Sequence, residues 1–251
     1  MRRALGGSGR DVLAKVNGLQ RAVTAADGRL DAELVAGAQA VLDRAGQRLR
    51  LSGEHTVVAL AGATGSGKSS LFNALCGLDL AATGVRRPTT SWPLACVWGT
   101  DGAGDLLDWL GIPRRHQLSR GSLLDASEAD SELHGLVLLD LPDHDSTEVS
   151  HHLEVDRLVL LADVLVWVLD PQKYADAAVH ERYLKPLATH RDIMLVVFNH
   201  VDELPVAQAD AALADARRLL DADGLGGVPV VATSAVHGDG LDVLRRALVQ
   251  R

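Results

Sequence analysis

The eight residues Gly62-Ala63-Thr64-Gly65-Ser66-Gly67-Lys68-Ser69 decide how this sequence folds. They match the pattern G-x-x-x-x-G-K-[ST], whose glycines let the backbone curl and turn its N–H groups toward phosphate oxygens. An apolar run at 56–61 precedes them, and a helical pattern at 69–75 follows, whose N-terminus attracts anions. This order of strand, loop and helix predicts a phosphate-binding loop, the alternative being a glycine-rich turn with a surface lysine.

The side chains of this loop have separate expected roles. Lys68 would neutralise the β- and γ-phosphates of a nucleoside triphosphate, in binding and in catalysis, and the Ser69 hydroxyl would ligate Mg²⁺. The backbone would surround the phosphates. The expected nucleotide-binding residues here are therefore Gly62, Ala63, Thr64, Gly65, Ser66, Gly67, Lys68, Ser69 and Ser70.

Apolar runs alternate with helical stretches along the rest of the chain. Strands are predicted at 56–61, 94–98, 136–139, 164–169, 193–198 and 228–232. Helices are predicted at 69–75, 149–161, 179–187, 207–220 and 241–249. This alternation predicts an α/β fold with a mostly parallel six-stranded sheet flanked by helices. In such sheets ligands bind where the strands end.

Two further segments flank or interrupt this pattern. Apolar residues recur at helical spacing on both sides of Asp27-Gly28, which predicts an N-terminal helical hairpin at 1–54 before a nucleotide-binding domain at 55–251. Residues 99–134 have the least clear pattern. A short helix between Leu106 and Leu110 and a mixed polar stretch predict a mobile insertion there.

Composition limits the class of protein. With 47% hydrophobic and 23% charged residues, the chain does not have the composition of a disordered protein. Its net charge of −8 disfavours nucleic acid as a partner. It has no run of 18 apolar residues and no secretory signal, and two cysteines, Cys76 and Cys96, which we expect to be reduced. These features predict a cytoplasmic location.

The strand at 193–198 ends in Asn199-His200-Val201-Asp202. Here the chain resembles the translation-factor-related GTPases, whose corresponding loop is N-K-x-D. The resemblance implies that the Asp202 carboxylate accepts two hydrogen bonds from guanine, which adenine cannot offer. Asn199 would bond the base or tie the loop to its neighbours. His200 stands where the family has lysine; its ring can stack but carries no permanent charge, which implies weaker affinity with unchanged specificity.

The loop after the last strand supports this resemblance. Residues 232–235 are Ala-Thr-Ser-Ala, similar to the family's S-A-x element, so the backbone N–H groups of Ser234 and Ala235 would contact the guanine carbonyl. The implied ligands are GTP or GDP with Mg²⁺, bound by a G domain at 55–251. An ATPase is the other alternative, and it requires that Asp202 has no role in binding the base.

The strand at 136–139 leads into Asp140-Leu141-Pro142-Asp143-His144, which resembles the family pattern D-x-x-G. Asp140 would hold Mg²⁺ through water. Asp143 takes the place of the glycine whose N–H contacts the γ-phosphate, and its carboxylate would repel that phosphate unless it is turned away. His144 either positions the attacking water, as in elongation-factor-type relatives, or is a solvated loop histidine.

The stretch Arg86-Arg87-Pro88-Thr89-Thr90 lies where the family has its first switch. The resemblance implies that Thr90, or else Thr89, ligates Mg²⁺ and takes part in catalysis. Arg86 or Arg87 would act as an arginine finger, in cis or across a dimer, or both arginines simply lie in an exposed loop.

Two departures from the family imply slow basal turnover. Gly65 has no side chain to hold a cation where potassium-activated relatives have asparagine. Thr64 stands where dynamin-like relatives have a water-orienting glutamine. Together with Asp143 they imply a switch that needs a partner to close.

The segment at 167–176 is similar to one in uncharacterised actinobacterial Era-like GTPases with dynamin-like relatives. The implied function is a slow switch or assembly GTPase that hydrolyses GTP to GDP and phosphate. The alternative is an assembly module that binds nucleotide with little or no hydrolysis. A homodimer or an activating protein would be its partner. Residues 1–251 alone are not expected to bind membranes, although a longer chain with a membrane-associated region would lie at the inner face of the membrane.

Overall fold

The computed structural model describes residues 7–51, 55–77, 92–99, 103–120, 132–143 and 156–250. The chain divides into two compact units. One comprises residues 1–55 and 101–109, and the other comprises residues 56–100 and 110–251.

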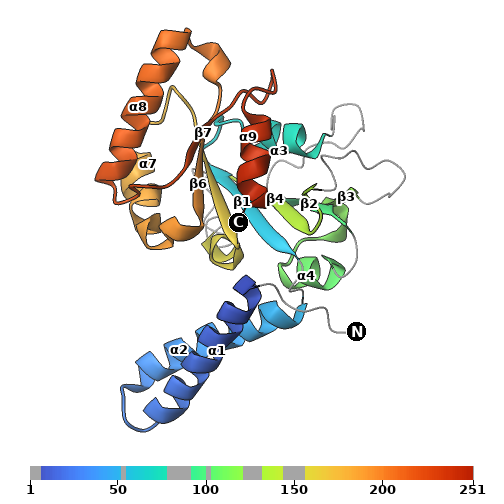
Figure 1. Cartoon of the computed structure of the whole chain (residues 1–251), viewed down its shortest axis with the longest axis vertical. Helices are drawn as coiled ribbons and strands as arrows, with labels where there is room; N and C mark the ends of the chain where they lie inside the picture. Colours follow the sequence, from blue (N-terminus) through green and yellow to red (C-terminus); the bar gives the residue numbers. More distant parts are fainter. Residues whose placement is uncertain are drawn as a thin grey trace. The chain divides into compact units, whose positions relative to one another are not determined.

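The first unit is a helical hairpin joined by a third helix. Helices α1 (Gly7–Ala26) and α2 (Ala32–Leu51) pack side by side (Figure 1). Gly28 turns the chain between them with φ +67°, and Asp31 Oδ1 caps α2 by accepting a hydrogen bond from the Glu33 N–H at 2.9 Å. Helix α4 (Ala103–Trp109), which the sequence-based division assigns to the following domain, packs against α2.

The second unit is built on a seven-stranded sheet with the order β3-β2-β4-β1-β5-β6-β7 (Figure 1). Its strands are β1 (Thr56–Gly62), β2 (Leu94–Trp98), β3 (Gln117–Arg120), β4 (Leu136–Asp140), β5 (Val164–Leu169), β6 (Met194–Phe198) and β7 (Val230–Ala232). Among the described strands, β2 and β4 pair antiparallel and every other pair is parallel. The predicted α/β class is confirmed, and the loops after β1, β4, β5, β6 and β7 emerge at one edge of the sheet.

The prediction of six strands misses β3. This strand lies at the edge of the sheet, parallel to β2 with Leu118 opposite Cys96. Leu118 is its only apolar residue and none of its four residues is fully buried, so the strand has no apolar run by which the sequence could show it. The insertion expected at 99–134 therefore contains regular structure: α4, the 3₁₀ turn η1 (Arg114–His116) and β3.

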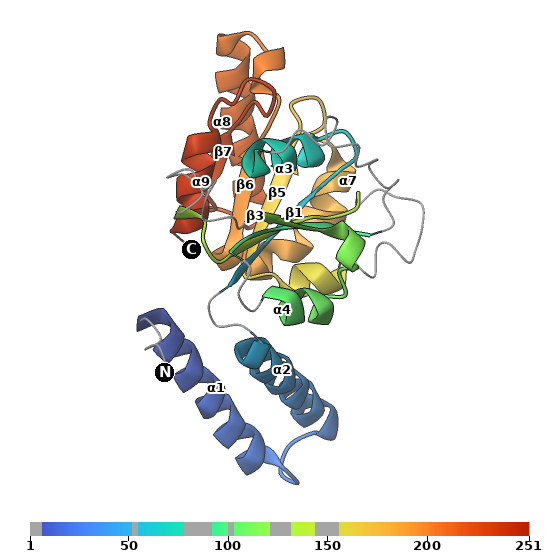
Figure 2. The ribbon, with the colours of Figure 1, turned by 90° about the vertical axis from the view of Figure 1, so that its right-hand side faces the viewer.

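Helices cover both faces of the sheet. On one face lie α3 (Lys68–Cys76) and α9 (Leu241–Val249), which contact each other (Figure 2). They bury Leu71, Phe72, Leu75, Leu241, Leu244 and Leu248 against strand residues such as Val58, Leu60 and Val166. The free cysteines Cys76 and Cys96 lie in this core.

The other elements of this unit follow β4 in the chain. They are a helical turn at 156–161, α7 (Ala177–Val179), the π turn η2 (His180–Leu184), η3 (Pro186–Ile193), η4 (Val201–Glu203) and α8 (Val206–Ala222). Leu158, Leu184 and Leu220 from these elements are buried. Among the described residues, no helix combines the length and the apolar character needed to cross a bilayer.

Candidate nucleotide-binding site

The phosphate loop connects β1 to α3 and is packed so closely that two of its glycines cannot be replaced. Gly67 has φ +83°, and a Cβ there would lie 2.2 Å from Asn199 Nδ2 and 2.6 Å from His200 Nε2. A Cβ at Gly62 would lie 2.4 Å from the Val168 carbonyl oxygen. Glycine is therefore needed for close approach as well as for backbone conformation.

Lys68 is already curled over this loop. Its side chain is 4% exposed, and its Nζ donates to the carbonyl oxygens of Gly62 at 2.8 Å and Ala63 at 3.0 Å. The same Nζ lies 2.5 Å from Asp143 Oδ1. The ammonium is thus held at the loop by two neutral acceptors and one carboxylate.

Asp143 turns its carboxylate toward the phosphate loop. The sequence left two orientations open, and this is the one that would repel a bound γ-phosphate. Oδ1 meets Lys68, and Oδ2 accepts a hydrogen bond from the Thr64 hydroxyl at 2.9 Å. Among the described residues, His200 is the only non-glycine residue with positive φ, so Asp143 needs no glycine-like conformation. A carboxylate therefore engages the lysine and the hydroxyl that face an incoming phosphate.

Asn199 joins three loops of the site. It is fully buried, and its Nδ2 donates to the Ser66 carbonyl oxygen of the phosphate loop at 3.1 Å. Its Oδ1 accepts from the Thr233 hydroxyl at 3.0 Å and from the Ala235 N–H at 3.3 Å. Asn199 was expected either to bond the base or to tie its loop to neighbouring loops. These hydrogen bonds correspond to the second role.

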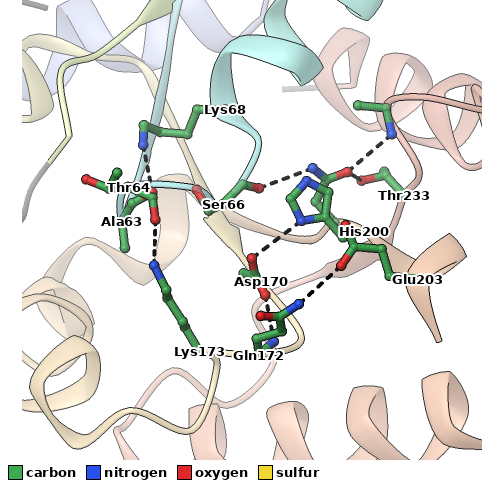
Figure 3. A network of polar contacts seen from close by, with 12 residues as sticks. Ala63, Thr64, Ser66, Lys68, Asp170, Gln172, Lys173, His200, Glu203 and Thr233 are labelled. Atoms are coloured by element: carbon green, nitrogen blue, oxygen red, sulfur yellow. Dashed lines mark hydrogen bonds and ion pairs between the residues drawn. The ribbon is translucent and has the colours of Figure 1, made fainter.

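His200 is held from two sides. It has φ +58°, its ring lies against Gly67, and its Nδ1 is 3.4 Å from Oδ2 of the buried Asp170 (Figure 3). The imidazole covers the phosphate loop at Gly67. The neighbouring carboxylate orients this ring.

Asp202 and Ser234 come together at the other end of the site. A hydrogen bond from the Ser234 side chain holds the pKa of Asp202 below its ordinary value, partial burial opposes this, and the nearby His237 and His200 lower the pKa further. Asp202 is therefore ionised at neutral pH, as an acceptor of two donor groups must be. Its side chain is 21% exposed and accessible to a ligand.

The residues predicted to hold Mg²⁺ fit a hard cation. Asp140 ends β4 and Ser69 lies in the first turn of α3, a helix that contacts β4. Both are half-buried and offer oxygen atoms, which Mg²⁺ prefers. In the described part of the chain no three His, Cys, Asp or Glu side chains form a metal cluster, so a metal would need these oxygens and those of a nucleotide. Thr89, Thr90, His144 and the two arginines of the first switch lie outside the described residues.

Sequence reasoning missed two charged residues of the site, Asp170 beside His200 and Lys173 at the phosphate loop. Lys173, in the loop after β5, donates from Nζ to the Thr64 carbonyl oxygen at 2.8 Å (Figure 3). Two signals pointed to it: it is one of only four lysines, and it follows a strand at the edge where ligands bind.

A glycine-rich loop between a strand and a helix, with a buried lysine and a second loop built around Asn199 and Asp202, defines a P-loop nucleotide-binding domain. The sequence profile of the 50S ribosome-binding GTPase family matches residues 57–200, more than half of the chain. The chain belongs to this family, and its second unit is a GTP-binding domain of the P-loop class.

Three solved structures share this fold at a TM-score of 0.50 each. A bacterial selenocysteine-specific elongation factor is 17% identical over 78% of this chain and 28% of its own. Era in complex with MgGDPNP and 16S ribosomal RNA nucleotides is 21% identical over 78% and 56%. A bacterial dynamin pair is 13% identical over 100% and 52%. The chain thus spans about half or less of these proteins, which resemble it in fold alone. No match was found among the curated proteins.

Proposed function

We propose that this chain binds GTP together with Mg²⁺ and hydrolyses it slowly to GDP and phosphate, as a nucleotide-dependent switch or assembly GTPase. The observation that carries the proposal is the position of Asn199, whose amide bonds Ser66 of the phosphate loop and Thr233 of the last loop. One buried side chain thereby fixes the distance between the phosphate end and the base end of a single ligand.

Each described residue of the site has a separate proposed role. The N–H groups of the phosphate loop and Lys68 bind the β- and γ-phosphates, Ser69 and Asp140 hold Mg²⁺, and Asp202 accepts from guanine. Bound Mg²⁺ would neutralise charge on the phosphate oxygens. Water attacks the γ-phosphorus in line, the bond to the β-phosphate oxygen breaks, and the products are GDP and phosphate. Thr90 and His144 complete the site in this proposal, on the strength of the sequence.

Slow turnover is part of the proposal. Lys68 must leave Asp143 before it can bind a γ-phosphate, and the two are held together at 2.5 Å. A second copy of the chain or an activating protein that draws Asp143 away would accelerate the reaction. A protein that binds GTP and releases no phosphate with or without such a partner would instead be a nucleotide-binding assembly module.

We extend the proposal to the location of the protein in the cell and to its binding partners. The chain acts in the cytoplasm among Era-like or dynamin-like relatives, and residues 1–251 do not bind membranes by themselves. RNA is not among the proposed partners because the net charge is −8, although the Era structure contains a ribosomal RNA segment.

Asp202→Ala is expected to weaken GTP binding by at least ~2 kcal/mol, because a charged acceptor of two hydrogen bonds is removed. Competition of GTP and ATP against labelled GTP measures the effect. Asp210→Ala, which removes an exposed carboxylate from α8, is the matched control and should bind as the parent does. If ATP displaces labelled GTP from the parent as well as GTP does, the guanine assignment is wrong.

His144→Ala is expected to lower the single-turnover rate of hydrolysis while leaving the affinities for GTP and GDP nearly unchanged. A group that orients the attacking water acts mainly in the transition state, and so contributes little to ground-state binding. Rapid-quench measurement of phosphate formation checks this. Hydrolysis at the parental rate would leave His144 as a solvated loop residue.

A further inference from the structure

Lys173 is a second cation at the phosphate loop. Its Nζ donates to the Thr64 carbonyl oxygen at 2.8 Å, next to the carbonyl of Ala63 that Lys68 binds. Two ammonium groups therefore hold successive carbonyl groups of the loop (Figure 3).

The turn that carries Lys173 is fixed by its own hydrogen bonds. The carbonyl oxygen of the buried Asp170 accepts from the N–H groups of Lys173 at 3.0 Å and Tyr174 at 2.8 Å. The Asp170 carboxylate accepts from the Gln172 N–H at 2.6 Å and faces His200. The ring of Tyr174 packs edge-on against Phe198. The carboxylate that orients His200 therefore also fixes the turn from which the Lys173 side chain extends.

Lys173 differs from Lys68 in its charge partners. Lys68 is paired with Asp143, so the two charges cancel in the nucleotide-free protein. Among the described residues, no carboxylate forms an ion pair with Lys173, which is exposed and bonded only to a neutral carbonyl. The net positive charge of the two lysines and Asp143 is therefore carried by Lys173.

Gly65 leaves space between this ammonium and the phosphate-binding side of the loop. A Cβ at Gly65 would lie 3.8 Å from Lys173 Nζ, with no other atom of the described residues beyond its chain neighbours Thr64 and Ser66 within 4 Å, and φ at Gly65 is +80°. A phosphate oxygen is a stronger acceptor for an ammonium group than a neutral carbonyl oxygen. Because the lysine side chain is flexible, its ammonium group can move past Gly65 from the Thr64 carbonyl oxygen to a phosphate oxygen.

We propose that Lys173 binds the terminal phosphate of the nucleoside triphosphate, exchanging the Thr64 carbonyl for a γ-phosphate oxygen. This inference rests on the proposed nucleotide function. Lys173 does so before Lys68 is free, because it has no ion pair with a described residue to break. It then neutralises charge on the terminal phosphate during hydrolysis, with no proton leaving its ammonium group. GDP has no γ-phosphate and does not use it.

The test compares Lys173→Met, which removes the charge and keeps the length, with Lys173→Arg, which keeps the charge. We expect Lys173→Met to weaken a non-hydrolysable GTP analogue by about tenfold, the loss of one charge-assisted hydrogen bond, and GDP by less than about threefold. Lys173→Arg should retain most of the analogue affinity. Lys185→Met removes an exposed lysine paired with Glu181 and should match the parent. Calorimetry on the full chain measures all four proteins.

Three results would overturn the inference: parental affinity for the analogue in Lys173→Met, equal weakening of analogue and GDP, or no rescue by arginine. The last two would mean that Lys173 only supports the Thr64 backbone. Failure of the proposed function gives a different result. If the parent prefers an ATP analogue, the guanine assignment is wrong, while the comparison of triphosphate with diphosphate still reports on Lys173.

Discussion

Lys68→Ala is expected to weaken GTP binding by at least about a hundredfold. The Lys68 side chain is 4% exposed, and no other lysine or arginine of the described residues donates to the Gly62 carbonyl oxygen. A charged hydrogen-bond donor lost from a buried site costs about 1.5–3 kcal/mol or more, and Lys68 reaches two phosphates. GDP should lose less than GTP, because only the β-phosphate contact is removed. Isothermal calorimetry with both nucleotides measures the difference.

The control for this change is Lys185→Ala, an exposed lysine that pairs with Glu181 one turn away. Circular dichroism should show that both variants fold, since Lys68 also bonds two loop carbonyls. An unchanged GTP affinity in folded Lys68→Ala protein would remove the basis for assigning a phosphate loop.

Six of the seven strands could be predicted, because each of the six is a short apolar run bounded by polar residues or glycine. The bounds of β2 and β5 agree with the predicted runs at 94–98 and 164–169, since both strands are buried along nearly their whole length. Helix α9 begins directly after Gly240, where the pattern placed it. Sequence alone could not give β3, because one leucine in four residues carries no alternation.

The loop at 199–202 could be predicted as a base-binding motif, but its packing against the rest of the site could not. The spacing of Asn199 and Asp202 indicated a ligand loop, while the contact of Asn199 with Ser66 joins residues 133 positions apart. The cover that His200 provides over Gly67 depends on the same approach. Such contacts follow from sheet order, in which β6 lies two strands from β1.

The charges around Thr64 were the least predictable part of the site. Asp143 meets Lys68 across 75 positions, and Lys173 meets Thr64 across 109. The direction of a side chain depends on partners that only the folded chain supplies. The expectation that Gly65 has no side chain to hold a cation did not foresee Lys173, whose own ammonium group lies beside that glycine.

Asp143→Asn is expected to tighten GTP by about tenfold and GDP by clearly less. The change keeps the shape of the side chain and removes the charge that now holds Lys68 at 2.5 Å. Affinity for a ligand falls with the fraction of protein whose site is competent to bind it, so releasing Lys68 raises the apparent affinity. The carboxylate also bonds the Thr64 hydroxyl, and its repulsion acts on the γ-phosphate that GDP lacks.

Asp143→Gly should give the same preference for GTP, since it too removes the carboxylate, and the agreement of the two variants would separate charge from shape. Asp210→Asn, an exposed change on α8, controls for the general loss of one negative charge. The parent should release phosphate slowly, and both Asp143 variants should reach half-saturation at lower GTP in single-turnover assays. Equal tightening of GTP and GDP would show that the carboxylate competes for the whole phosphate loop. Unchanged affinities would show that the contact between Asp143 and Lys68 does not weaken nucleotide binding. The slow rate of hydrolysis would then need another cause.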